Sequence, residues 1–461
     1  MIGKVGLQKG AGARHGVSGE DGTQAVHTEE QKPIPAREEG RALTKDLMEK
    51  ICERANLLRA FKRVVANQGS AGVDGMTTKD LADWLRTNEE KLVGSLLDGS
   101  YEPKLVKGVK IPKPGGGARQ LGVPTVVDRL VQQAILQVLE PILDPMFSEG
   151  SFGFRPKRSA HQALAKASEY VAGGRCIVVD IDLEKFFDQV NHDILMSRLA
   201  RRIEDKRTLK IIRRFLTAGM MENGVVMERE KGTPQGGPLS PLLANLLLDD
   251  LDRELEKRGH EFCRYADDCN IYVQTKRAGE RVMEGVTEFL ERKLKLKVNR
   301  QKSAVAFVGE RKFLGYRILA GGRLSIAPAS LKRAKDRIKK ITSRRRGKAL
   351  KSIVEELNEF TRGWVQYFRY AQATKLLRET DKWIRRKLRC YRLKQCKQSR
   401  AITSFFRSLG ASEAEVKAAG SGRRWWYASD LAIAHSCMSV RWFQDLGLLS
   451  LEERYLRLQI R

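Results

Sequence analysis

Four aspartates in two short segments have the residue types and spacing for metal-dependent chemistry. Asp267 and Asp268 lie between two strand-like segments, at a position where a hairpin turn normally uses Asn-Gly or Asp-Gly. Asp180 and Asp182 end an apolar, strand-like segment, and the period of two in a strand puts both on one face. Neighbouring carboxylates repel each other unless a cation holds them, so the two pairs are candidates for a single ion-binding cluster.

A carboxylate cluster on neighbouring strands suits magnesium, which prefers oxygen ligands and keeps substrate phosphates in its coordination shell. Two such ions about 3.5–4 Å apart can activate an attacking hydroxyl and stabilise the leaving group of an in-line displacement. The bland alternatives are an exposed acidic turn for the first pair and a strand-end or helix-cap acid for either member of the second. A further pair, Asp249-Asp250, lies in a Leu-rich helical segment and is interpreted as a solvated helix face.

Hydrophobic periodicity predicts the elements that would position these acids. A buried strand over 175–182 and a strand, two-acid turn and strand over 261–274 would carry them. The other expected elements are a helix from near Leu47 that ends before a turn cluster at 69–75, a basic strand-like segment over 101–124, a buried helix over 126–143, a helix from about His192 and an amphipathic helix over 239–258.

The charge balance restricts the class of partner. The 461 residues include 86 Lys and Arg against 56 Asp and Glu, a formal net charge of +30. Cations that neutralise phosphates release condensed counterions, so this surplus favours a nucleic acid over a membrane or an inert basic surface. No apolar run approaches the ~18 residues of a spanning helix, and the N-terminus has no secretory-signal pattern. The sequence predicts no membrane association.

Cysteine usage indicates the redox compartment. The chain has seven cysteines at irregular spacings, which is typical of free thiols in a reducing cytoplasm rather than of a disulfide scaffold. No two CxxC pairs occur, so no structural zinc site is expected.

Composition also divides the chain. Residues 1–44 have few large apolar residues and predict a disordered lead outside the core. Residues 331–346 hold nine basic residues and one acid, and residues 378–400 hold ten basic and two acidic, so a second, helical and cationic domain is expected. Residues 401–461 predict a small appended domain. The aromatic residues of 364–368 could stack on RNA bases, but their helical spacing favours a core position.

An ordered set of motifs resembles the group II intron reverse transcriptase/maturase family over residues ~45 to ~400. The two acidic segments resemble the palm motifs of reverse transcriptases, and the last motif resembles the maturase, or X, region. In chain order the motifs are Ile111-Pro112-Lys113-Pro114, Leu121-Gly122-Val123-Pro124-Thr125 with Asp128-Arg129, Ser151-Phe152-Gly153-Phe154-Arg155-Pro156, Arg158-Ser159-Ala160-His161, Asp182-Leu183-Glu184-Lys185-Phe186-Phe187-Asp188, Gly232-Thr233-Pro234-Gln235-Gly236-Gly237-Pro238-Leu239-Ser240-Pro241, Tyr265-Ala266-Asp267-Asp268, Phe313-Leu314-Gly315-Tyr316 and Arg362-Gly363-Trp364-Val365-Gln366-Tyr367-Phe368.

The resemblance implies a catalytic role for three of the aspartates. Asp182, Asp267 and Asp268 match the metal-binding aspartates, which would hold two Mg²⁺ ions, with deoxynucleoside triphosphates as substrates. The spacing to Phe186-Phe187 favours Asp182 over Asp180, and this choice stays open.

The resemblance also implies nucleotide contacts. Phe186 matches the residue under the incoming sugar that excludes a ribose 2′-hydroxyl. Lys113 and Arg119 match the cations that clamp the triphosphate, although both could be ordinary charges of a basic hairpin. Gln235 matches a residue that contacts the nucleotide and the template strand.

The basic helices resemble the thumb of this family. Their cations could be solvated faces, but positive charge this dense is better explained by a nucleic-acid backbone beside it. The residues expected to bind RNA are Lys332, Arg333, Lys339, Lys340, Arg385 and Arg386.

The family implies an α+β right-hand fold, with fingers and palm over 45–325, a thumb/maturase domain over 326–400 and a DNA-binding-like domain over 401–461. The tail has cysteines in no ligand spacing and one histidine, His435, so no endonuclease is expected, as in the bacterial class C branch.

The implied function is RNA-directed DNA synthesis, with maturase assistance to splicing and intron mobility by target-primed reverse transcription. The implied partners are the intron RNA, an RNA template with a DNA or RNA primer, and target DNA, in a bacterial cytoplasm near the nucleoid.

Three alternatives remain open at this point. A retron, diversity-generating or CRISPR-associated reverse transcriptase would share the acidic motifs, but the 362–368 segment disfavours it. An RNA-binding splicing factor without polymerase activity would have no reason to keep like charges at one site. A generic basic nucleic-acid binder predicts that the aspartates can be changed without chemical consequence.

Overall fold

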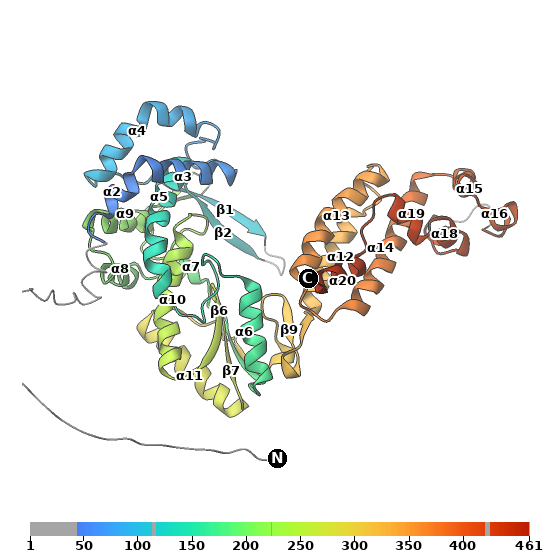
Figure 1. Cartoon of the computed structure of the whole chain (residues 1–461). Coiled ribbons are helices and arrows are strands. Elements are labelled where there is room, and N and C mark those ends of the chain that lie inside the picture. Colours follow the sequence, from blue (N-terminus) through green and yellow to red (C-terminus); the bar gives the residue numbers. More distant parts are fainter. Residues whose placement is uncertain (1–43, 113–116, 223, 420–424, 461) are drawn as a thin grey trace, which may run out of the picture.

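The computed structural model describes residues 44–460, except 113–116, 223 and 420–424. The predicted disordered lead therefore lies outside the described residues, apart from Thr44. The described chain consists of fingers, a palm and a long helical arm (Figure 1). This arrangement confirms the α+β right-hand fold with a helical thumb that the sequence predicted.

The fingers combine short helices with a basic hairpin. A helix begins at Leu47 as predicted, and the turn cluster at 69–75 follows the helical segment. The hairpin belongs to a sheet of order β2-β1-β4-β5. The elements are α2 (Leu47–Cys52), α3 (Arg54–Ala66), α4 (Leu81–Leu97), β1 (Val106–Pro112), β2 (Ala118–Val123), β4 (Met220–Glu222) and β5 (Val225–Met227).

The palm is a four-stranded antiparallel sheet of order β6-β7-β3-β8. Its strands are β3 (Ile177–Ile181), β6 (Glu261–Tyr265), β7 (Asp268–Val273) and β8 (Ala304–Phe307). Helices α10 (Ser240–Lys257) and α11 (Lys276–Lys293) pack on one face, and α6 (Ala160–Ala172) packs on the other. The two predicted strands over 261–274 are confirmed, but the turn between them is Ala266–Asp267, and Asp268 is the first residue of β7.

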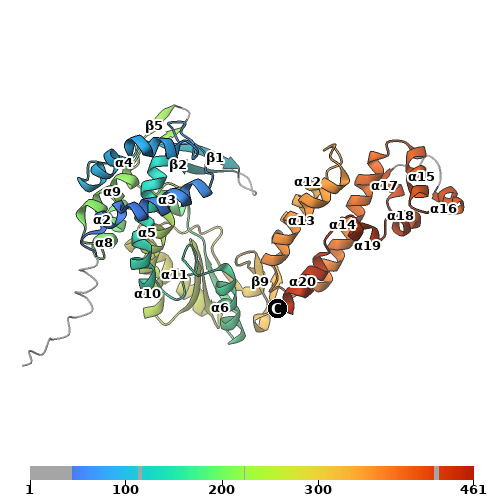
Figure 2. The same cartoon turned by 45° about the horizontal axis from the view of Figure 1, so that its top comes forward.

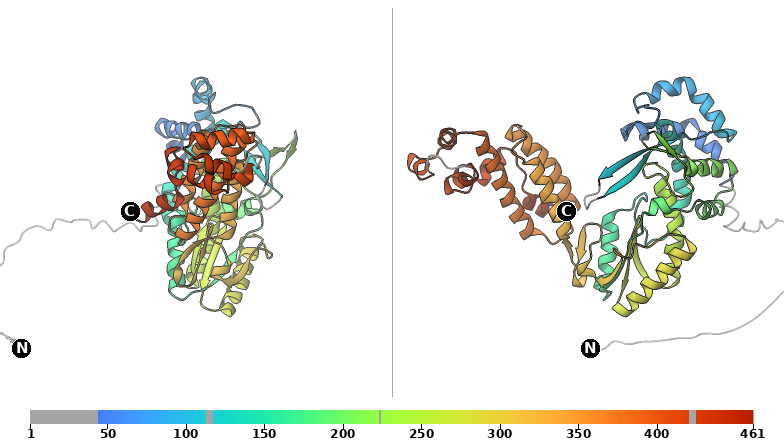
Figure 3. Two further views of the ribbon diagram at one scale, coloured as in Figure 1. Left: turned by 90° about the vertical axis from the view of Figure 1, so that its right-hand side faces the viewer. Right: turned by 180° about the vertical axis from the view of Figure 1, so that it is seen from behind.

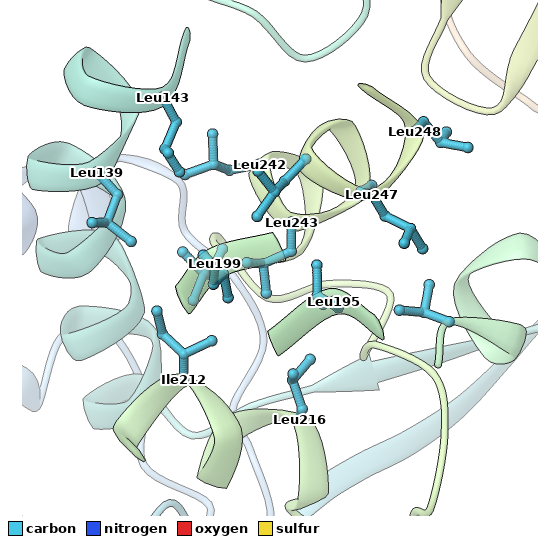
Figure 4. Packing of buried hydrophobic residues seen from close by; sticks show 14 of the residues in the cluster. Leu139, Leu143, Leu195, Leu199, Ile212, Leu216, Leu242, Leu243, Leu247 and Leu248 are labelled. Atoms are coloured by element: carbon cyan, nitrogen blue, oxygen red, sulfur yellow. The ribbon is translucent and has the colours of Figure 1, made fainter. Parts of the chain in front are cut away.

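A leucine-rich core joins the palm to the fingers. Figure 4 shows leucines and Ile212 of α5 (Val126–Leu143), α8 (His192–Ala200), α9 (Lys206–Thr217) and α10 gathered around one interior. Burying each such side chain stabilises the fold by about 2 kcal/mol relative to exposure. The predicted helices over 126–143 and from His192 are confirmed. The first begins where Thr125 caps it by accepting a bond from the Asp128 amide, 3.1 Å away.

The interpretation of Asp249-Asp250 as a solvated helix face was wrong for Asp249. Its side chain is only 1% exposed and pairs with Arg202 at 2.9 Å. Asp250 is partly exposed and pairs with Arg198 at 2.6 Å. Helix α10 lies between the sheet and α8, so more than its leucine face is buried. The polar positions beside that face therefore need partners rather than water.

The thumb begins at the edge of the palm. A two-stranded hairpin of β9 (Tyr316–Ile318) and β10 (Leu324–Ile326) leads into α12 (Pro328–Ile341), α13 (Leu350–Tyr367) and α14 (Thr374–Gln395). These helices extend away from the palm in Figures 1 and 2. The core position predicted for the aromatics of 364–368 is confirmed, since Phe368 is buried and its ring centroid lies 5.0 Å from that of Trp364.

The C-terminal helices extend beyond the thumb and then return to it. They are α15 (Ser399–Ser408), α16 (Glu413–Ala419), α17 (Trp425–Ala428), α18 (Ala432–Cys437), α19 (Val440–Asp445) and α20 (Leu451–Gln459). Figure 3 shows the arm diverging from the fingers, and Figure 1 labels α15, α16 and α18 at its far end. Helix α20 packs against α13 and α14, so one hydrophobic cluster spans residues of 326–400 and 401–461.

The remaining elements are the short helix α7 (Phe186–Gln189) and three 3₁₀ turns, η1 (Asp144–Met146), η2 (Val308–Glu310) and η3 (Ala320–Gly322). All seven cysteines are free thiols, as predicted. No helix in the described part of the chain is long and apolar enough to cross a membrane.

Candidate active site

The register of the palm sheet brings the two acidic segments together. Asp180 pairs with Asn270 across β3 and β7, and Ile181 pairs with Cys269. One further step along the antiparallel pair puts Asp182 opposite Asp268. Asp180, Asp182 and Asp268 line one cavity of about 560 Å³, on the sheet face that packs against α6 and the thumb.

Asp267 lies in the turn between β6 and β7. Tyr265 pairs with Asp268, so Ala266 and Asp267 form a two-residue turn. Ala266 has φ +59°, a left-handed conformation that tight hairpin turns require and that non-glycine residues rarely adopt. The turn therefore holds Asp267 directly before Asp268 at the mouth of the strand pair.

The electrostatics of Asp268 show that negative charge is concentrated here. Loss of solvation, followed by repulsion from Asp267, Asp180 and Asp182, raises the pKa of Asp268 to about 6, although Lys312 opposes the shift. A cation bound among these carboxylates would relieve this repulsion.

Asp180 and Asp182 have different partners. Asp180 accepts a hydrogen bond from Arg311 Nε at 2.8 Å, and Arg311 Nη2 lies 2.6 Å from the same carboxylate oxygen as an ion pair. Burial raises the pKa of Asp180, and Arg311 partly offsets that shift. Asp182 forms a long ion pair with Lys302, whose Nζ lies 4.0 Å from Oδ1. Asp182 therefore keeps more of its carboxylate free for a metal ion.

Backbone contacts fix the position of Asp182. Its amide donates to Ser303 Oγ at 3.0 Å, and its carbonyl accepts from the Asn299 amide at 2.8 Å. The carboxylate thus projects from a rigid strand end rather than from a loose loop.

The donor set fits a hard divalent cation. Carboxylate oxygens are the ligands that Mg²⁺ prefers, and the repulsion on Asp268 is of the sign that a cation would relieve. Within the described ranges, no three His, Cys, Asp or Glu side chains are grouped closely enough to hold a metal ion in the present conformation.

A second cavity, of about 510 Å³, lies between the fingers and the palm. Arg119 and Gln235 both line it, and the Arg119 Nε donates to Gln235 Oε1 at 2.5 Å. Phe187 also lines this cavity, whereas Phe186 is buried with 2% exposure. Lys113 lies outside the described residues. The structure thus brings Arg119 and Gln235 together and leaves Phe186 inside the core.

The predicted RNA-binding cations lie on two thumb helices, α12 and α14. Arg385 is half-buried and the other five are exposed. Lys339 pairs with Asp336 at 3.0 Å, and Arg386 pairs with Asp430 at 3.1 Å. Arg333 also lines the acidic cavity, so the thumb contributes a positive charge beside the aspartates.

Sequence reasoning missed Arg311, Lys302 and Arg264. Arg311 is two residues before the Phe313-Leu314-Gly315-Tyr316 motif, and this proximity was the only available signal. Arg264 directly precedes the acidic motif and is completely buried. A charged residue inside an apolar strand requires a partner, so its type and position could have identified it.

The antiparallel palm with paired acids at one turn, the basic fingers hairpin and the helical thumb define a right-hand nucleic-acid polymerase. Residues 111–318 match the family model described as reverse transcriptase (RNA-dependent DNA polymerase). Residues 331–408 match the group II intron, maturase-specific domain. The chain belongs to the group II intron reverse transcriptase/maturase family.

Relatives support this membership. Protein YkfC of Escherichia coli (strain K12) is 32% identical over 305 residues, which are 57% of this chain and 80% of that protein. The group II intron-encoded protein LtrA of Lactococcus lactis subsp. cremoris is 39% identical over 203 residues, 43% of this chain. The match spans only 34% of the length of LtrA.

Two solved structures show a weaker likeness. A chain of the partial Cas6-RT-Cas1–Cas2 complex is 27% identical, with coverage of 53% of this chain and 42% of that chain and a TM-score of 0.35. A chain of the telomerase structure from Candida albicans is 13% identical, with coverage of 69% and 66% and a TM-score of 0.39. At these scores the fold assignment rests on the sheet topology and the sequence matches.

Proposed function

We propose that this protein is the RNA-directed DNA polymerase of a group II intron and that it works by two-metal nucleotidyl transfer. The observation that carries the proposal is that Asp182 and Asp268 line one cavity at the end of the palm sheet, with Asp267 directly before Asp268 in the turn. Asp182, Asp267 and Asp268 would hold two Mg²⁺ ions. When bound, such ions activate the primer 3′-hydroxyl and stabilise the departing pyrophosphate.

The nucleotide would bind between the fingers hairpin and the palm. Arg119 and Lys113 neutralise the triphosphate of the incoming deoxynucleotide. Gln235, held by Arg119, contacts the nucleotide and the template. Phe186 packs under the sugar, and this role rests on its spacing from Asp182. Phe187 is the alternative, because it lines the cavity between the fingers and the palm.

The second proposed role is assistance to splicing of the parent intron RNA. The maturase-domain match supports it, and the exposed cations of α12 and α14 offer a surface for an RNA backbone. The same chain would copy RNA from a DNA or RNA primer and act on target DNA during target-primed reverse transcription. The seven free thiols support a bacterial cytoplasm as its compartment, with nucleoid association during DNA engagement.

Primer extension on an RNA template with deoxynucleotides and Mg²⁺ tests the polymerase role. The native protein should extend the primer, and Asp267→Asn and Asp268→Asn should lose synthesis while retaining affinity for the template–primer duplex. A native protein that binds RNA tightly and never extends would leave only the splicing role. That role is tested by splicing of the intron RNA that flanks the gene, with and without the protein.

A further inference from the structure

The turn that holds Asp267 and Asp268 depends on support from outside the palm sheet. Ala266 has a left-handed backbone, which costs free energy that surrounding contacts must offset. Strand β6 is also the edge strand of the sheet, so β7 alone supports it from within. The surrounding residues therefore decide whether the turn stays in place.

One completely buried guanidinium provides a direct contact to the turn. Arg264 is 0% exposed, and its Nη1 donates to the Ala266 carbonyl at 2.9 Å. The same nitrogen donates to Asn245 Oδ1 at 3.0 Å. The turn is thus tied to helix α10 through a single side chain.

The remaining donors of Arg264 are also used. Nε and Nη2 donate to the two oxygens of Asp252 at 2.7 and 2.6 Å, and Nη2 also donates to Ser151 Oγ at 2.8 Å. All five N–H groups of the guanidinium therefore have an acceptor. Because every donor of the planar Arg264 guanidinium is hydrogen-bonded, the group cannot rotate, and its bond to the Ala266 carbonyl has a fixed direction.

The segment 150–153 closes the edge of β6. The Arg264 amide donates to the Gly150 carbonyl at 2.8 Å, and the Phe152 amide donates to the Arg264 carbonyl at 2.9 Å. Gly153 lies so close to the turn that a Cβ at this position would be 2.2 Å from the Ala266 nitrogen. Asn245 Nδ2 donates to the Gly153 carbonyl at 2.8 Å, so α10 holds both sides of the contact.

We infer that Arg264 is a positioning residue, fixed by Asp252, Asn245 and Ser151, which sets the Ala266–Asp267 turn so that Asp267 and Asp268 meet Asp182. The segment Ser151-Phe152-Gly153 belongs to a sequence motif to which no role was given. It packs directly against that turn and supports it. This inference rests on the proposed polymerase function, because it concerns the placement of the acids that would hold the metal ions.

A purely structural role is the competing explanation, since removing one partner of any buried ion pair destabilises a protein. The chain provides a matched control. Asp249 lies one turn before Asp252 on α10, is equally buried, and pairs with Arg202 rather than with a residue of the acidic turn. Asp249→Asn and Asp252→Asn therefore impose the same chemical change on two buried, ion-paired carboxylates of one helix.

The experiment compares native protein, Asp252→Asn, Asp249→Asn and Arg264→Lys in four measurements. These are Tm, affinity for the template–primer duplex, Mn²⁺ binding by electron paramagnetic resonance of the free ion, and kcat and KM for a single deoxynucleotide addition. Asp252→Asn and Arg264→Lys should lower kcat about 100-fold, because a 1 Å displacement of reacting groups has an effect of this order. Mn²⁺ affinity should fall as well, with KM and duplex affinity nearly unchanged.

Asp249→Asn should lose a similar amount of Tm while keeping kcat and Mn²⁺ affinity within about twofold of native. Equal losses of kcat and Mn²⁺ affinity in Asp249→Asn and Asp252→Asn would overturn the inference. If the Asp252 and Arg264 variants do not fold, Gly153→Ala replaces them, because it leaves the Arg264 bonds intact and pushes directly on the turn. A Gly153→Ala protein with native kcat and Mn²⁺ affinity would then overturn it.

The proposed function and this inference fail separately. A native protein that never adds a nucleotide removes the proposed function. The Mn²⁺ titrations still decide the inference in that case, because they measure the geometry of the acids without any catalysis.

Discussion

At the scale of single residues, the acids of the cavity differ in what balances their charge. Arg311 neutralises Asp180 through one hydrogen bond and a close ion pair. Among the residues that the structure describes, no guanidinium pairs with Asp268, and loss of solvation together with repulsion from Asp267, Asp180 and Asp182 raises its pKa. Asp180 is therefore already neutralised by Arg311, whereas Asp268 is the carboxylate whose charge a bound cation would balance.

The raised pKa of Asp268 predicts a pH-dependent stability in metal-free protein. A carboxyl whose pKa is higher in the folded than in the unfolded state stabilises the fold while it is protonated. This contribution is present below the ordinary value of 3.8 and is lost as the pH rises through about 6. We expect Tm measured by calorimetry with chelator to fall over this range more steeply in native protein than in Asp268→Asn. Addition of Mg²⁺ should restore Tm above about pH 6 in native protein only. Equal slopes of Tm against pH in native protein and Asp268→Asn would contradict a raised pKa for Asp268.

Discrimination between sugars separates Phe186 from Phe187. Phe186→Val should raise kcat/KM for ribonucleotides relative to deoxynucleotides at least about tenfold, because a smaller side chain under the sugar leaves room for a 2′-hydroxyl. Phe187→Val is the matched control, since the two rings are neighbours with centroids 5.1 Å apart. Relaxed discrimination in Phe187→Val alone would transfer the role to Phe187, the residue that lines the cavity.

At the scale of elements, α20 is held to the thumb by a buried cap. Asp381 of α14 accepts from the Leu451 amide at 3.0 Å, from the Glu452 amide at 3.1 Å and from Ser450 Oγ at 2.8 Å. We expect Asp381→Ala to lower the free energy of unfolding by about 2 kcal/mol, because three donors at the start of a helix lose their acceptor.

Urea unfolding measures this loss, and limited proteolysis should release α20 more rapidly. The control is Glu452→Gln, which removes a partly exposed ion pair with Arg378 and should cost less than about 1 kcal/mol. An equal loss in the two variants would show that the cap contributes nothing beyond a surface pair.

Local hydrophobic periodicity was sufficient to predict some helices and strands, but it could not predict features that depend on distant parts of the chain. The strand ending in Asp180 and Asp182 and the hairpin at Asp267 follow from a period of two and a turn, which a short window of sequence contains. The burial of Asp249 depends on α8, and the return of α20 depends on a helix about 70 residues earlier. Contacts of this kind are not visible in local periodicity.

For the candidate site too, the sequence predicted the local features and missed the long-range contacts. The acidic residues could be found because they are adjacent in the chain and share a strand face. The support of their turn could not, because Arg264 is bound by residues 12, 19 and 113 positions away. A sequence shows that Arg264 must have partners but does not identify them.

At the scale of the whole molecule, the net charge of +30 predicts salt-dependent nucleic-acid binding. Lys340 has no carboxylate partner among the residues that the structure describes, whereas its neighbour Lys339 pairs with Asp336. Lys340→Gln should reduce the slope of log affinity against log salt concentration by about 0.9 for a duplex, the contribution of one phosphate contact.

Lys339→Gln, the matched control, should change the slope less, because its charge is already partly balanced. Filter binding of an RNA–DNA duplex over a range of KCl concentrations provides both slopes. Identical slopes for native protein and Lys340→Gln would exclude this face of α12 from the duplex-binding surface.

We propose that the acids at the end of the palm sheet perform the chemistry. Single-turnover addition of one deoxynucleotide to a primer on an RNA template tests it most directly, with native protein, Asp182→Asn, Asp268→Asn and Asp180→Asn. The rate should fall at least about 1,000-fold in Asp182→Asn and Asp268→Asn, since loss of electrostatic stabilisation of this kind costs about that much. It should fall much less in Asp180→Asn, with duplex affinity unchanged throughout. Near-native rates in Asp182→Asn or Asp268→Asn would contradict the account.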